Sequence, residues 1–459
     1  MIEKLSVKNF KSWADLPALE FGKVTALFGA NSSGKTSLIQ LLLMLKQTAV
    51  ALDKRVLNFG SAHDLVDLGS YEDLVYGHKL DLDLGFSLTW SPVDNDLFNA
   101  SMRVPCDRIT LTVAFGYLGE QVVVKRLSYR TEIERERPYQ DENGEVYDNL
   151  SYGPWSVFVE QSPDGQYKIS SLVGTKVEAR VEPLGFYTLR FQPTGSGKNG
   201  DNVGYADSVF RGLSRSFEEL LDSIYYLGPL REYPRREYRW SGERPMSVGV
   251  RGEYAVQVML SKLVTEQSRE LVDCANEWLQ RLGMTDRVDL RPVAPGTRLY
   301  EFVVQTSGYR HEANIMDVGF GVSQVLPIIV LAHFAPPGSL LILEQPEIHL
   351  HPQVQTELAD LFLETALKRN IQFLIESHSE YLLMRLQRRL AERQGTFARL
   401  TEQDVRLYFC KREAEASVLE PLELDEYGRI KNWPKDFFGD AVTERRAMTE
   451  AMLERQSAK

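Results

Sequence analysis

The chain of 459 residues contains only three cysteines, which lie far apart: Cys106, Cys274 and Cys410. Their odd number and wide spacing fit neither a disulfide framework nor a zinc site, so we expect a reducing, cytoplasmic location. Long hydrophobic runs are also missing, because His333 and the turn Pro336-Pro337-Gly338 interrupt the most apolar stretch, Val325 to Leu343. That stretch predicts a buried helix followed by a buried strand, and no membrane span.

Three other features are absent. No heptad pattern is sustained, which excludes a long coiled-coil arm. The first residues lead directly into a strand-like pattern, so no secretory signal is expected. Positive charge is in deficit, with a net charge of −11. A uniformly acidic protein is not attracted to nucleic acid as a whole, so such binding needs a local basic patch. The 43% of hydrophobic residues and the length predict about two or three globular domains.

Glycine is placed where a phosphate-binding loop needs it. Residues 29–36 read GANSSGKT, between an apolar run at 24–28 and a helical apolar pattern at 36–47. Strand, glycine loop and helix are the context of a P-loop, whose amides cradle phosphate oxygens. Lys35 is expected to reach the β- and γ-phosphates of ATP, and the Thr36 hydroxyl to coordinate Mg²⁺. The other predicted nucleotide contacts are Gly29, Asn31, Ser32, Ser33, Gly34 and Ser37.

Two later apolar runs end in residues suited to the same chemistry. Leu340 to Leu343 is followed by Glu344, and Phe373 to Ile375 runs on to His378. Buried parallel strands deliver such side chains to the carboxyl edge of a sheet, beside the phosphate loop. We therefore predict Glu344 as the Mg²⁺ partner through water. His378 is predicted to sense the γ-phosphate as a hydrogen-bond donor.

The pattern along the chain predicts an α/β protein. Alternation at 80–130 indicates antiparallel strands, and the polar stretch rich in Gly, Pro and Tyr that follows indicates an insertion. Strands alternating with helices further on indicate a mostly parallel, covered sheet. We predict a P-loop ATPase head with a mixed β-sheet core, an antiparallel β subsheet and a β-rich insertion. Its parts are the first half of the head (1–130), the insertion (131–225), the second half (226–405) and a tail with short strands and a helix (406–459).

The phosphate loop, the acidic strand and the histidine strand, in this order, resemble the ABC-type ATPase heads of the SMC, RecF and overcoming-lysogenization-defect proteins. Val7 to Ser12 is similar to their N-terminal strand signature, which adds Lys11 and Ser12 to the nucleotide contacts. Three further segments resemble a compact bacterial subgroup related to Septu-type anti-phage ATPases: 226–231, 319–327 and 424–438. The resemblance implies an ABC/SMC-like head.

In that family two heads sandwich two ATP molecules, and a signature segment of one head contacts the γ-phosphate held by the other. The candidate signature is Asp317 to Gln324, although its order of Gly and Ser departs from the usual one. The resemblance assigns nucleotide contacts to Gly319, Gly321, Ser323 and Gln324. The alternative is a glycine turn that caps a helix at 323–334. The family also implies a homodimer or higher homo-oligomer and a separate effector, a nuclease. The residues after His378 are too few for an internal nuclease domain.

The general base is an open question. Many family members place a catalytic Glu directly after the metal acid, whereas this chain has Gln345. Glutamine orients water but cannot accept its proton. Either Glu347 is the base, or hydrolysis is slow and ATP acts mainly as a dimer clamp; we expect slow hydrolysis. The predicted catalytic residues are therefore Glu347, Gln345 and His378.

Two arginine groups and a histidine pair allow alternatives. The first group lies among aromatic residues: Arg231, Arg235, Arg236, Arg239 and Arg244. Arginines interleaved with aromatics suit nucleic acid, whereas the acids between them favour a salt-bridged loop. The second group has helical spacing and predicts a solvated face: Arg385, Arg388, Arg389 and Arg393. His349 and His351 fit a metal site or, as the pattern favours, packing against the acidic strand.

Three functions follow from these patterns. The first is an ATPase that dimerises around ATP and controls a partner nuclease in phage defence. The second is a stand-alone DNA-repair ATPase related to RecF. The third, the nucleotide-binding subunit of a transporter, is weakened by the departing signature segment. A neighbouring nuclease gene favours the first, and DNA-stimulated hydrolysis by the chain alone favours the second.

Overall fold

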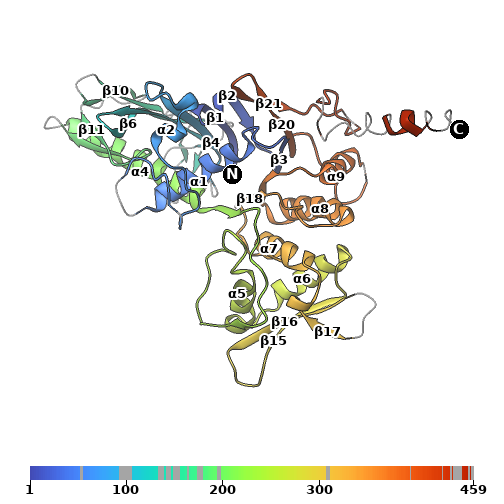
Figure 1. The fold of residues 1–459 in the computed structure, drawn as a ribbon. Helices are drawn as coiled ribbons and strands as arrows, with labels where there is room; N and C mark the ends of the chain where they lie inside the picture. Colours follow the sequence, from blue (N-terminus) through green and yellow to red (C-terminus); the bar gives the residue numbers. More distant parts are fainter. Residues whose placement is uncertain are drawn as a thin grey trace.

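The computed structural model describes residues 1–51, 55–61, 63–92, 106–132, 139–140, 146–147, 156–162, 165–172, 179–193, 198–306, 311–392, 394–425, 427–434, 437, 447–452 and 455. Three sheets organise this part of the chain (Figure 1). No helix within it is long and apolar enough to cross a membrane. In the predicted tail, residues 447–452 are helical, and most of the segment from 435 onward lies outside the described residues.

The largest sheet has nine strands and is antiparallel throughout. The predicted antiparallel strands at 80–130 are confirmed as three of them. The inserted segment supplies four more strands, which extend the same sheet. Across the sheet the strands run β12 (Leu189–Pro193), β11 (Ala179–Pro183), β10 (Tyr167–Leu172), β9 (Ser156–Gln161), β6 (Gln121–Glu132), β5 (Arg108–Leu118), β4 (Leu84–Trp90), β1 (Ile2–Phe10) and β2 (Trp13–Glu20). The pair β7 (Tyr139–Gln140) and β8 (Val146–Tyr147) stands apart.

The second sheet has six strands and confirms the predicted mostly parallel core. Its order is β13 (Ile224–Leu227), β18 (Leu340–Glu344), β19 (Gln372–Glu376), β3 (Val24–Gly29), β20 (Val405–Glu413) and β21 (Ala416–Pro421). All neighbours are parallel except β21, which pairs antiparallel with β20. Strand β3, which precedes the phosphate loop, therefore lies between β19 and β20 (Figure 1). Both of these neighbours come from the last quarter of the sequence.

Helices bury both faces of this sheet. Every residue of β3, β18 and β19 is buried, and alternate side chains enter two different cores. Leu27 joins the core that contains α1 (Lys35–Val50), α4 (Lys198–Asp222) and the nine-stranded sheet. Phe28 joins the core formed with α7 (Gly321–Phe334), α8 (Pro352–Arg369) and α9 (Glu380–Ala391). Continuous apolar strands without a polar face are the sequence signature of this arrangement.

A smaller layer packs beneath α7 (Figure 1). It contains α5 (Ala255–Leu260), which continues as a π-helical turn, and α6 (Glu270–Arg281). The third sheet belongs to it and consists of β14 (Tyr238–Arg239), β15 (Arg287–Pro292), β16 (Leu299–Gln305) and β17 (Glu312–Asn314). A short turn of helix at Ile315–Asp317 then leads to α7. The predicted α/β class, with a mixed-sheet core and an antiparallel subsheet, is thus confirmed.

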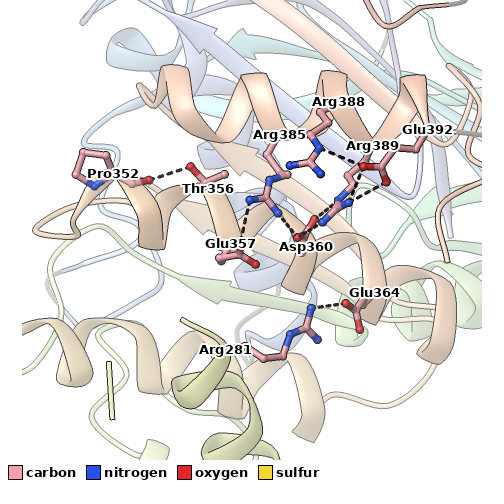
Figure 2. Close-up of polar contacts among 10 residues, drawn as sticks. All are labelled: Arg281, Pro352, Thr356, Glu357, Asp360, Glu364, Arg385, Arg388, Arg389 and Glu392. Atoms are coloured by element: carbon pink, nitrogen blue, oxygen red, sulfur yellow. Dashed lines mark hydrogen bonds and ion pairs between the residues drawn. The ribbon is translucent and has the colours of Figure 1, made fainter. Parts of the chain in front are cut away.

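The prediction of a solvated arginine face on α9 is wrong for two of its members. Figure 2 shows Arg385 and Arg389 turned toward α8, where both guanidinium groups contact the Asp360 carboxylate. Arg385 also pairs with Glu357 at 2.8 Å. Asp360 is only 1% exposed, so the ion pairs lie inside the contact between α8 and α9. Arg388 is exposed and pairs with Glu392; Arg393 lies outside the described residues.

We expect Asp360→Ala to lower the free energy of unfolding by roughly 1–3 kcal/mol, because Arg385 and Arg389 lose a buried acceptor but keep Glu357 and Glu392 as partners. Arg388→Ala, which removes an exposed pair on the same helix, should change it by less than about 1 kcal/mol. Urea denaturation of both variants measures the difference. Equal, small effects would show that the Asp360 pairs add nothing to the packing of the two helices.

Candidate functional site

The path of residues 29–37 depends on two glycines. Gly29 ends β3 with φ 139°, and Gly34 precedes α1 with φ 98°. A Cβ at Gly29 would lie 2.1 Å from the Cys410 carbonyl oxygen on β20, and one at Gly34 would lie 2.5 Å from the Ser417 hydroxyl. No side chain caps the start of α1. The loop therefore brings uncapped amides to a helix N-terminus, the arrangement that binds phosphate.

Lys35 lies along this loop and is almost completely buried. Its Nζ donates hydrogen bonds to the carbonyl oxygens of Gly29 at 3.0 Å and Ala30 at 2.8 Å. It also lies 4.0 Å from a carboxylate oxygen of Glu376. Burial lowers the pKa of Lys35, and the negative charge of Glu376 opposes that shift. The ammonium group is thus held over the loop by acceptors that a phosphate can replace.

The other loop residues differ in exposure. Asn31 and Ser32 are exposed, and Ser32 has a φ of 61°. Ser33 is buried, and its hydroxyl has no hydrogen-bond partner. The Ser37 amide donates to the Gly34 carbonyl oxygen at 3.2 Å within the first turn of the helix. An unpartnered hydroxyl on the inner side of the loop is consistent with an absent polar ligand.

Glu376 is a site residue that the sequence analysis missed. The Thr36 hydroxyl donates to Glu376 at 2.9 Å, whereas Glu344, the predicted metal partner, accepts from the Tyr226 hydroxyl at 2.8 Å. Glu344 and Glu376 are direct neighbours across β18 and β19. The signal was present in the sequence, since Glu376 ends the second buried strand just before Ser377 and His378.

The two carboxylates share a buried position. Burial, and then the charge of Glu376, raises the pKa of Glu344 to about 7. Burial also raises the pKa of Glu376, against the effects of Lys35 and Thr36. No group of three or more acidic, His or Cys side chains with metal-site geometry occurs in the described part of the chain. Two carboxylates and a hydroxyl fit Mg²⁺, which takes few protein ligands and completes its shell with water and phosphate oxygens.

The predicted catalytic residues meet at the same sheet edge. Glu347 is buried, and its Oε1 accepts a hydrogen bond from the His378 amide at 2.6 Å, while its Oε2 has no partner. Burial raises the pKa of Glu347. Gln345 adopts a φ of 45°, and its amide donates to the Glu376 carbonyl oxygen at 2.8 Å. The His378 side chain is exposed, and desolvation followed by the charge of Lys35 lowers its pKa.

The turn between β1 and β2 also touches the loop. The Ser12 hydroxyl accepts a hydrogen bond from the Ser417 hydroxyl at 2.7 Å, and it would lie 2.9 Å from a Cβ at Gly34. Lys11 instead donates to the Gln40 side chain on α1 at 2.6 Å. Of the two residues that the family resemblance added, Ser12 therefore lies against the phosphate loop.

The candidate signature segment lies elsewhere. Gly321 begins α7, and the Ser323 hydroxyl donates to the Phe320 carbonyl oxygen at 2.7 Å. Gln324 is buried with an unpartnered Nε2, whereas a Cβ at Gly319 would meet nothing within 4 Å. Within the part that the structure describes, no hydrogen bond joins this segment to the phosphate loop of the same chain.

The arginines of the predicted nucleic-acid cluster differ in exposure. Arg231 is only 6% exposed, so its inclusion in that cluster was wrong. The remaining members are exposed: Arg235, Arg236, Arg239 and Arg244. Arg236 forms a two-pronged ion pair with Asp317, at 2.7 and 2.9 Å. Glu232 lies within 4 Å of Arg235 and Arg251. These pairs support the alternative of a salt-bridged loop.

The two histidines after the acidic strand have packing roles. His349 packs edge-on against the Phe320 ring, with 5.7 Å between the ring centroids. The His351 side chain caps α8 by accepting from the Gln353 amide at 3.4 Å. Neither of these contacts is with the acidic strand, so the predicted packing against that strand stays a prediction.

Segments of the chain match three family models. Residues 1–152 match the "AAA ATPase domain", and residues 196–385 match the "AAA domain, putative AbiEii toxin, Type IV TA system". Residues 400–447 match a "Protein of unknown function (DUF3696)". The comparison with curated proteins gave no match. The phosphate loop and the acidic strand thus lie in two segments that each resemble an ATPase domain.

Solved structures of SMC heads are similar to this chain. The SMC head domain from Thermotoga maritima is 14% identical, with a TM-score of 0.41, over 92% of this chain and 99% of that one. The SMC head bound to the C-winged helix domain of ScpA is 12% identical, with a TM-score of 0.43, over 92% and 98%. An SMC head with an extended coiled coil, bound to the C-terminal domain of ScpA derived from Pyrococcus furiosus, is 12% identical, with a TM-score of 0.40, over 92% and 96%.

The fold and the site define the class of this protein. A phosphate loop on a central parallel strand has acidic strand ends beside it, within segments that match ATPase domains. The chain therefore has an α/β fold with a phosphate-loop motif, and two of its segments each resemble an ATPase domain. Its place in the Septu-type subgroup stays a prediction.

Proposed function

We propose that this chain binds ATP with Mg²⁺ at residues 29–37 and hydrolyses it slowly. The observation that carries the proposal is the contact of Lys35 and Thr36 with Glu376, next to Glu344, at one edge of the central sheet. Lys35 and the loop amides neutralise and orient the phosphates. Strand β3, which leads into the loop, belongs to the first ATPase-like segment and pairs with β19 of the second, so residues of both segments contribute to the proposed site.

Thr36, Glu344 and Glu376 would hold the metal. A Mg²⁺ ion held by these residues would neutralise negative charge on the phosphates. Glu347 has an unpartnered carboxylate oxygen at this edge and serves as the base for the attacking water. Gln345 and His378 flank it and orient water and phosphate. Glu347 has only one free carboxylate oxygen, and the residue directly after the proposed metal ligand Glu344 is not a carboxylate. Both features support slow turnover.

The experiment that tests the site is a calorimetric titration with ATP, with and without Mg²⁺. Glu376→Gln keeps the shape of the side chain and its contact with Thr36 but removes one charge. In this variant we expect the increase in ATP affinity that Mg²⁺ produces to be smaller than in wild type by roughly tenfold or more. Glu364→Gln is the control, because it makes the same chemical change on α8. Glu364 pairs with Arg281 of α6 and with Lys368, and not with residues of the phosphate loop. If Glu376→Gln and wild type respond to Mg²⁺ alike, Glu376 is not a metal-site residue.

The signature segment supports action as a homodimer or higher homo-oligomer. Among the described residues no hydrogen bond joins Gly319–Gln324 to the phosphate loop of the same chain, so we propose that a second copy presents this segment to a bound nucleotide. The uncapped start of α7 suits a phosphate in that arrangement. Light scattering with and without ATP and Mg²⁺ checks this, and a mass that stays at one chain under both conditions contradicts it.

The biological role that we propose is control of a partner nuclease in anti-phage defence, in the cytoplasm. Its support is the resemblance of segments 226–231, 319–327 and 424–438 to defence ATPases. The match of residues 196–385 to a model whose description names a toxin–antitoxin system fits a component of a multi-protein module. Co-purification of a nuclease that depends on ATP supports this role. DNA-stimulated hydrolysis by the chain alone supports the repair ATPase instead.

A further inference from the structure

Arg231 differs from the other arginines of its segment. It follows β13 through Gly228, Pro229 and Leu230, and its side chain turns inward, so that the residue is only 6% exposed. Its Nε and Nη1 atoms are buried and have no hydrogen-bond partner. Buried donors without acceptors are rare in folded proteins, and such a group calls for a physical explanation.

The position is costly for the folded chain. Removing a guanidinium group from water without forming hydrogen bonds is strongly unfavourable. Burial lowers the pKa of Arg231 to about 10, although the charges of Tyr226, Glu344 and Glu347 oppose the shift. Arg231 is therefore still a cation at neutral pH. Electrostatic attraction to these groups offsets part of the cost, but it leaves the two N–H groups unpaired.

The surroundings of Arg231 are those of the nucleotide site. Strand β13 pairs in parallel with β18, with Leu227 opposite Leu343, so Arg231 follows the same sheet edge at which Glu344 ends β18. Tyr226, on the strand that leads to Arg231, holds Glu344 by a hydrogen bond of 2.8 Å. The guanidinium fork, with two free donors in one plane, is the geometry that phosphate oxygens accept.

We propose that Arg231 donates its free Nε and Nη1 hydrogens to the terminal phosphate of ATP held by the phosphate loop of the same chain. Arg231 thereby distinguishes ATP from ADP. This inference rests on the proposed ATP site. It explains why an unpaired cation is retained in a buried position where Met or Leu would fit at lower cost.

Calorimetry with a non-hydrolysable ATP analogue and with ADP tests the assignment. For Arg231→Met we expect affinity for the analogue to fall roughly 10- to 100-fold, while ADP affinity stays within about twofold. Arg231→Lys keeps the charge but loses the fork, and should give an intermediate loss. Arg239→Met is the matched control, since Arg239 is exposed on β14; both nucleotides should bind it as they bind wild type.

The same variants separate this contact from a structural role. Because Arg231→Met removes an unpaired buried charge, the Tm without nucleotide should not fall. Equal losses for both nucleotides, no loss for either, or a lowered Tm with unchanged preference for the analogue would overturn the assignment. Failure of the proposed ATP site itself is distinguishable, because wild type would then bind neither nucleotide.

Discussion

Lys35→Met is expected to weaken ATP binding by roughly 100-fold or more and to abolish measurable hydrolysis. The Lys35 ammonium group donates to two carbonyl oxygens of the phosphate loop and would donate to the phosphates of bound ATP instead. Each charge-assisted hydrogen bond to a phosphate contributes about 1.5–3 kcal/mol. Methionine preserves the length and apolar stem of the side chain. The loss should therefore come from charge and not from a cavity. Calorimetry with ATP and Mg²⁺ measures it.

Lys46→Met is the control on the same helix. Lys46 is also partly buried, and its Nζ donates to the Leu221 and Asp222 carbonyl oxygens at 2.9 and 3.1 Å, away from the loop. Burial lowers the pKa of both lysines. Lys46→Met should leave ATP affinity unchanged, even if it lowers stability. ATP binding by Lys35→Met that equals wild type would remove the basis of the proposed function.

Glu347→Gln is expected to reduce turnover by about 100-fold or more while leaving ATP affinity within a few fold, because a general base contributes about 10²–10⁴-fold. The amide keeps the hydrogen bond from the His378 backbone but cannot accept a proton. Because burial raises the pKa of Glu347, wild-type turnover should rise with pH as this group loses its proton. The variant should lack this pH dependence. A coupled phosphate-release assay across pH measures both effects.

Gln345→Glu is a companion to this experiment. It restores a carboxylate directly after Glu344, where many related ATPases have their base, and should raise turnover. If Glu347→Gln hydrolyses ATP as fast as wild type, Glu347 is not the base. The clamp interpretation, in which ATP mainly holds two heads together, would then be preferred.

The sequence located the phosphate loop and the strand ends because these are local patterns. Gly29, Gly34 and Lys35 lie within one short motif, and four apolar residues before Glu344 are enough to predict a buried strand. The contact of Thr36 with Glu376 depends instead on sheet order. Since β19 lies between β3 and β18, the β19 carboxylate is nearest to Thr36. Sheet order is a property of tertiary structure and cannot be read from any single segment.

The burial of individual arginine side chains was the other property that could not be predicted from local composition. Arg231 and Arg236 lie five positions apart in one arginine-rich stretch, yet one is buried without hydrogen-bond partners for two of its nitrogens and the other is exposed. Arg385 and Arg389 have the spacing of a solvated helix face, but Asp360 on the neighbouring helix turns them inward. In each case the deciding residue is distant in sequence.

The place of β3 in the central sheet has a consequence for how the protein is made. The phosphate loop is synthesised long before the partners of its strand, which pairs with residues 372–376 and 405–413. Strands β1, β2, β4, β5 and β6 can pair earlier, because they are neighbours in sequence. Contacts of such long range form late and slowly. During translation the antiparallel strands can therefore pair first, while the apolar side chains of β3 stay exposed until residues 372–376 and 405–413 have been made.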